Sequence, residues 1–120
     1  MLPISSSVKI YCCRTPTNLH KSFDGLPGMV QQHFAADPTA GHLFIFFNRT
    51  FKMVKILYWD CDGYAIWAKR LTQGQFNLPK SADGKIELDS RELYAILSGI
   101  KPKRYYKRFS LKKDTGYALD

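Results

Sequence analysis

Some stretches of the chain alternate apolar and polar residues, as a β-strand does, and others place apolar residues three or four positions apart, as a helix does. The first third of the chain contains both patterns. Residues 8–13 alternate weakly between apolar and polar side chains, which predicts a short strand. The next apolar residues lie three or four positions apart, as on one face of a helix, at Leu19, Phe23, Leu26, Val30 and Phe34. Pro27 interrupts this pattern because it lacks the N–H that a helix interior requires. The sequence therefore predicts a kinked helical segment over residues 17–36, with either a kink or a junction of two short helices at Pro27.

The middle third has the pattern of β-strands. Residues 42–47 are dense in aromatic and branched side chains, as expected for a strand that is covered on both faces. Residues 51–59 and 64–71 alternate in polarity, and the turn formers of residues 60–63 lie between them. Three consecutive strands with short links predict an antiparallel meander. Residues 75–79 predict a further short edge strand, ended by a proline.

The last third predicts one more strand and one helix. Residues 85–88 read as extended, and Asp89 with Glu92 forms the pattern of a capping box for a helix over residues 90–98. The predicted fold class is therefore α+β, with a small, mostly antiparallel sheet, a kinked N-terminal helical segment and a short C-terminal helix. A length of 120 residues fits one domain. We expect that domain in residues 1–100 and a basic, aromatic tail in residues 101–120.

The distribution of charge indicates a polyanionic partner. The chain has 18 Lys and Arg against 10 Asp and Glu, and residues 101–120 alone contain seven bases and two acids. Such bases suit phosphates, and the tail aromatics suit stacking on exposed bases. We expect Lys55 and Lys69 to share one face of the meander. The predicted nucleic-acid-binding residues are Lys55, Lys69, Arg70, Lys101, Lys103, Arg104, Lys107 and Arg108. A solvated sheet face with a tail that only maintains solubility is the alternative.

No set of residues predicts catalysis, a cofactor or a metal site. Asp24, Asp60 and Asp62 are the best candidates for the metal ligands of a nuclease. Aspartate is also a common turn residue next to glycine, and that role explains these positions equally well. Cys12 and Cys13 are adjacent on a predicted strand, so they point to opposite faces and are poor joint ligands of zinc. With a third cysteine and no CxxC pair, we expect free, reduced thiols.

Further features concern location and protein partners. No apolar run approaches the ~20 residues of a membrane helix, and the N-terminus lacks the pattern of a signal peptide, so we expect a cytoplasmic protein. Large aromatic side chains cluster near the third turn, and such residues are favoured as interface anchors. A protein-interaction subunit without DNA contact is therefore a second interpretation of the same chain.

Several ordered stretches resemble one protein family. They are residues 20–26 (His-Lys-Ser-Phe-Asp-Gly-Leu), 37–46 (Asp-Pro-Thr-Ala-Gly-His-Leu-Phe-Ile-Phe), 55–60 (Lys-Ile-Leu-Tyr-Trp-Asp) and 68–71 (Ala-Lys-Arg-Leu). Their order and spacing resemble the small accessory protein, TnpB or Orf-two-like, of the IS66 family of bacterial insertion sequences. The resemblance covers roughly residues 3–101. It departs from the family pattern at Asn18-Leu19-His20, where the family commonly has Asp-Met-Arg.

The resemblance implies a function but no mechanism. Members of this family are encoded beside a larger transposase, and no catalytic residues are established that carry over to this chain. From the resemblance and the charge we expect a non-catalytic accessory protein of DNA transposition. Its expected partners are DNA, in particular element ends, and the transposase of the same element.

Overall fold

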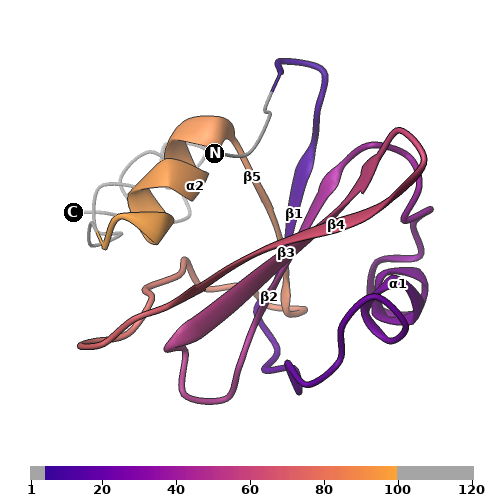
Figure 1. Cartoon of the computed structure of the whole chain (residues 1–120). Coiled ribbons are helices and arrows are strands. Elements are labelled where there is room, and N and C mark those ends of the chain that lie inside the picture. Colours follow the sequence, from indigo (N-terminus) through magenta and orange to yellow (C-terminus); the bar gives the residue numbers. More distant parts are fainter. Residues whose placement is uncertain (1–4, 100–120) are drawn as a thin grey trace.

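Across the described residues, the fold is built on one mixed β-sheet of five strands in the order β4-β3-β2-β1-β5 (Figure 1). The computed structural model describes residues 5–99. In chain order the strands are β1 (Ile10–Cys13), β2 (Leu43–Phe47), β3 (Met53–Asp60), β4 (Gly63–Arg70) and β5 (Lys85–Leu88). β1 and β2 are parallel, and every other neighbouring pair is antiparallel. The mostly antiparallel sheet and its meander of β2, β3 and β4 confirm the expected class, whereas the parallel pair was not predicted.

β2 is the centre of the molecule. All five of its residues are buried, which confirms the expectation of a strand covered on both faces. Because neighbouring side chains of a strand point to opposite faces, β2 contributes to two separate apolar cores. Leu43, Ile45 and Phe47 lie in one core, and Phe44 and Phe46 lie in the other.

The first core lies beneath α2 (Ser90–Leu97). Leu93, Ile96 and Leu97 of this helix pack with residues of β1, β2 and β3 on one face of the sheet. The predicted capping box is confirmed: the Asp89 carboxylate accepts from the backbone N–H of Glu92 at 2.7 Å, and the Glu92 side chain accepts from the N–H of Asp89 at 2.9 Å. These bonds satisfy N–H groups that the first turn of a helix leaves without a partner.

The second core lies on the opposite face, beneath α1 (Leu26–Met29) and the π-helical turn η1 (Val30–Phe34). Figure 1 shows α1 and α2 on opposite sides of the sheet. The kinked helical segment expected over residues 17–36 is confirmed only in part, because its helical turns begin at Leu26. Residues 19–24 form turns instead, and Pro27 lies in the first turn of α1, where its missing N–H costs nothing.

The side chain of Phe23 also departs from the predicted helix face. It is 52% exposed, although the three-or-four spacing placed it in the core. The helix ends at Ala35, which takes a left-handed φ of 52°. Leu19, Leu26 and Val30 do pack into the second core and Phe34 packs against it, as the pattern indicated, so Phe23 is the exception among the five apolar positions.

The predicted edge strand at residues 75–79 is not formed either. Phe76 and Leu78 are buried against the first core, and the Phe76 N–H donates to the carbonyl of Phe51 at 2.7 Å. The segment is a loop that covers the sheet face instead of extending the sheet. Consequently β4 is the outermost strand at this edge.

Candidate nucleic-acid interface

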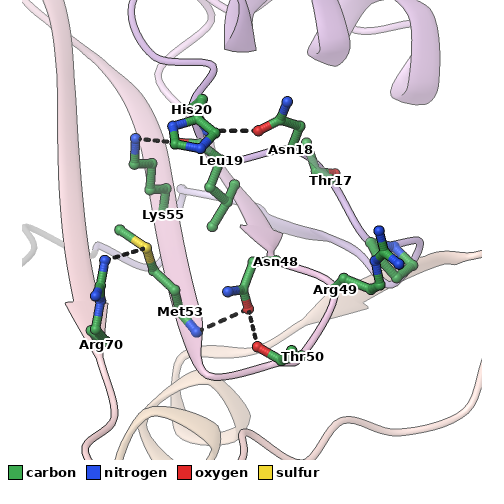
Figure 2. Close-up of a pocket in the computed structure, with 11 residues that line it drawn as sticks. Thr17, Asn18, Leu19, His20, Asn48, Arg49, Thr50, Met53, Lys55 and Arg70 are labelled. Atoms are coloured by element: carbon green, nitrogen blue, oxygen red, sulfur yellow. Dashed lines mark hydrogen bonds between the residues drawn. The ribbon is translucent and has the colours of Figure 1, made fainter.

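A groove of about 730 Å³ opens where the loops after β1 and β2 meet. The carboxyl ends of parallel strands lie at the same edge of a sheet, so the parallel pairing brings residues 16–20 beside residues 48–50. The Thr17 N–H donates to the carbonyl of Phe47 at 2.8 Å and fixes one loop to the other. The first residues of β3 and the last residue of β4 complete the lining through Met53, Lys55 and Arg70 (Figure 2).

Asn48 organises the loop between β2 and β3. Its Oδ1 accepts from the backbone N–H groups of Lys52 at 3.0 Å and Met53 at 3.1 Å, and from the Thr50 hydroxyl at 3.4 Å. These donors fix which end of the amide is oxygen. The Nδ2 group is therefore a donor, and Figure 2 shows it directed toward the groove.

Lys55 is held in place at the wall of the groove. Its Nζ donates to the backbone carbonyl of Leu19 at 2.6 Å and to that of Lys21 at 3.3 Å. An ammonium group has three N–H donors, so one remains for a ligand. The two carbonyl contacts pre-position the charge without neutralising it, because neither partner is an anion.

The groove has a strongly positive lining. Arg49, Lys55 and Arg70 are basic, His20 lies beside them, and none of the lining residues among residues 5–99 carries a carboxylate. Within residues 5–99 the one ion pair is formed elsewhere, between Lys9 and Glu87 at 3.8 Å. The guanidinium of Arg70 contacts the Met53 sulfur at 3.9 Å, a weak acceptor that leaves its charge available. The arrangement suits an anion with several oxygens, such as a phosphodiester.

The structure separates the two lysines that we expected on one face. The register pairs Lys55 with Ala68 and Val54 with Lys69, so Lys55 and Lys69 point to opposite faces of the sheet. That expectation is wrong. Lys69 instead donates from Nζ to the carbonyl of Leu97 at 2.9 Å, at the C-terminal end of α2. Arg70, one position later, shares the face of Lys55 and lies in the same groove.

The remaining predicted binding residues belong to the tail. Lys101, Lys103, Arg104, Lys107 and Arg108 lie outside the described residues. Asn48 was not among the residues predicted to form a site. An asparagine directly after a fully buried strand, followed by a basic residue, was the signal that could have indicated it.

The candidate metal and cysteine chemistry finds no support in residues 5–99. No three His, Cys, Asp or Glu side chains come together there as metal ligands. Cys12 and Cys13 face opposite cores, as the sequence predicted. Burial raises the pKa of the thiol of each, so both stay protonated and are poor nucleophiles.

None of the helices in the described part of the chain is long and apolar enough to cross a membrane.

Comparison with known proteins identifies the family. Residues 8–107 match the family described as IS66 Orf2 like protein. The chain belongs to this family. The match covers the whole groove and extends into the basic tail, and it confirms the resemblance seen in the sequence. Membership implies that this IS66 Orf2-like chain is an accessory protein of an insertion sequence.

Two relatives of this IS66 Orf2-like protein come from Sinorhizobium fredii. The uncharacterized protein y4hO is 31% identical over 100 residues, which cover 83% of this chain and 87% of the relative. The uncharacterized protein y4jC is 27% identical over 118 residues, which cover 98% of this chain and all of the relative. No solved structure matches the chain.

Proposed function

We propose that this protein binds DNA as a non-catalytic accessory factor of transposition, and that the groove beside Asn48 holds the phosphate backbone. The observation that carries the proposal is the charge of Arg49, Lys55 and Arg70 in a lining to which the described part of the chain contributes no carboxylate. Phosphate contacts supply most of the affinity of a protein for DNA, because they release condensed counterions. A groove with three cations and few acids is the electrostatic footprint of such contacts.

The geometry favours contact with the backbone over reading of bases. The described residues present no helix of recognition type on the groove, and the cations come from two loops and two strand ends. Backbone contacts position a protein on DNA but carry no sequence information. We therefore propose that the groove gives register and orientation on the duplex, while the basic tail adds affinity.

The proposed partners follow from the family. We propose DNA at the ends of the element as the nucleic-acid partner and the transposase of the same element as the protein partner. Stable co-purification of the two proteins in high salt, together with undetectable DNA affinity, would favour the alternative of a pure protein-interaction subunit.

The experiment is fluorescence anisotropy with a labelled duplex of element-end sequence and a scrambled duplex of equal length. The variant Arg49→Gln/Lys55→Gln/Arg70→Gln removes the three charges of the groove and leaves the tail intact. We expect its Kd for both duplexes to rise at least about tenfold, since each lost phosphate contact weakens binding. Circular dichroism establishes that the variant is folded.

The matched control removes the same charge elsewhere. Lys80, Lys85 and Arg91 are exposed and lie outside the groove, so Lys80→Gln/Lys85→Gln/Arg91→Gln makes an equal change in net charge. We expect it to change the Kd by no more than about threefold. Equal losses for the two triple variants would show that only net charge matters, and the proposed interface would then be wrong.

A further inference from the structure

Within residues 5–99, no strand pairs with the outer edge of β4. It is the outermost strand, it has eight residues without proline, and its inner stretch of Tyr64 to Trp67 is half-buried and carries no charge. The other edge strand, β5, has four residues and exposes Lys85 and Glu87. Proteins protect sheet edges by keeping them short or charged, because an open edge templates pairing with another strand. β5 has this protection along its whole length, whereas the charged residues of β4, Lys69 and Arg70, lie only at its C-terminal end.

The hairpin geometry shows which backbone groups of β4 point outward. Asp60 pairs with Gly63 across a two-residue link, so these two residues form a hydrogen-bonded pair. Hydrogen bonding to β3 then alternates along β4. It leaves the N–H and C=O groups of Tyr64, Ile66 and Ala68 directed away from the sheet. Within residues 5–99, no hydrogen bond from another segment reaches those groups.

We propose that a second copy of this chain pairs with β4, antiparallel and centred on Ile66. The two-fold axis of such a dimer is perpendicular to the sheet, so each side chain stays on the face where it lies in one copy. Residues opposite each other must then lie on the same face, which requires that the register be centred on one residue. Centring on Ile66 places Ile66 against Ile66, Tyr64 against Ala68 and Ala65 against Trp67. Each large side chain then lies beside a small one or an equal one.

The same register also matches charges. It brings Asp62, in the turn just before β4 of one copy, beside Arg70 at the end of β4 of the other, twice by symmetry, and both residues are exposed and form no ion pair within the described chain. Opposite charges facing each other across strands stabilise pairing. A register centred on Trp67 brings the two tryptophans together and places Tyr64 opposite Arg70, with no pair of opposite charges. Size and charge thus favour the register centred on Ile66 over the one centred on Trp67.

The resulting dimer has one continuous sheet. Because the two-fold axis is perpendicular to that sheet, α1 of each copy lies on the same face, and so do both basic grooves. Two grooves on one face would give a bipartite surface for one duplex. Only this consequence rests on the proposed function. Arg70 belongs to both surfaces, so dimerisation is measured in the absence of DNA.

The experiment is sedimentation velocity of the full chain without DNA, over a range of concentrations and at a physiological ionic strength of about 0.15 M. We expect a dimer that dissociates on dilution. Ala68→Pro removes one outward N–H from each copy at an exposed position, so it should raise the dimer Kd at least about tenfold while the fold is retained. Glu87→Lys on the protected β5 edge is the control and should leave the Kd unchanged.

Charge exchange tests the register. Asp62→Arg and Arg70→Asp each place like charges opposite one another, and each should raise the dimer Kd about tenfold. The double variant Asp62→Arg/Arg70→Asp should restore dimerisation. A chain that is monomeric at every concentration overturns the proposal. This holds also where hydrogen exchange shows that the chain's own tail protects the outward amides of β4 in the monomer. A dimer that Ala68→Pro and both charge reversals leave intact overturns it as well.

Discussion

Lys69 joins the sheet to the end of a helix, and its removal should destabilise the fold without weakening DNA binding. Its Nζ lies 2.9 Å from the carbonyl of Leu97, in the last turn of α2. The carbonyls of a last helical turn have no partner within the helix, and a cation there also interacts favourably with the helix dipole. Lys69→Met keeps most of the apolar stem and deletes only the ammonium group.

The magnitude follows from two contributions. A hydrogen bond to a charged group contributes about 1.5–3 kcal/mol, and this contact falls in the lower part of that range because the side chain is only partly buried. A charge at a helix end contributes roughly 0.3–1 kcal/mol, part of which is the same interaction. Lys69→Met should therefore lower the free energy of unfolding by about 1–2 kcal/mol. For a domain of this size that corresponds to a fall in Tm of roughly 5–10 °C.

The assay pairs urea denaturation, followed by far-ultraviolet circular dichroism, with DNA anisotropy on the same samples. Lys85→Met serves as the control, since Lys85 is exposed on β5 and its side chain has no hydrogen bond among the described contacts. Lys69→Met should unfold at lower urea than the control and bind DNA equally well at a temperature where both are folded. Unchanged stability, or a loss of DNA affinity as large as that of Lys55→Met, would refute the argument that register separates these two lysines.

Three further predictions concern local features of the fold. Asp89→Ala removes the N-cap of α2 and should lower the free energy of unfolding by about 1 kcal/mol in urea titrations. Ala35→Gly relieves a left-handed φ of 52° and should raise the Tm, by an amount equivalent to up to about 1 kcal/mol. The N–H of Lys85 and the hydroxyl of Ser81 hold the pKa of Asp83 below its usual range. This group stabilises the fold at neutral pH and loses that effect as pH falls through its folded pKa, so Asp83→Asn should lose less stability than the parent chain between about pH 6 and pH 3 in urea titrations.

The sequence predicted correctly the features that depend only on residues close together in the chain. The capping box at Asp89 and Glu92 was readable because both bonds form within one helical turn. The double burial of β2 was readable because an unbroken apolar run leaves no polar face for solvent. The helix spacing failed at Phe23 because periodicity alone does not distinguish a helix from successive turns, and the proline fits a helix start as well as a kink.

The candidate groove depended on pairings that the sequence does not display. It exists because β1 lies parallel to β2, and that contact joins strands separated by the whole α1 and η1 segment. The faces of Lys55 and Lys69 depended on the length of the turn between β3 and β4. A two-residue link places Lys55 opposite Ala68, and a shift of one residue reverses the face of every side chain. The sequence identified the basic residues, but only the strand register shows which of them face the groove.

The salt dependence of DNA binding tests the central claim most directly. The slope of log Kd against log salt concentration counts the phosphate contacts, at about 0.9 for each contact in duplex DNA. We predict that Arg49→Gln/Lys55→Gln/Arg70→Gln reduces the slope by about 2–3, and that Lys80→Gln/Lys85→Gln/Arg91→Gln leaves it within about 0.5 of the parent chain. A slope that the groove variant does not change would contradict the claim that this groove holds the DNA backbone.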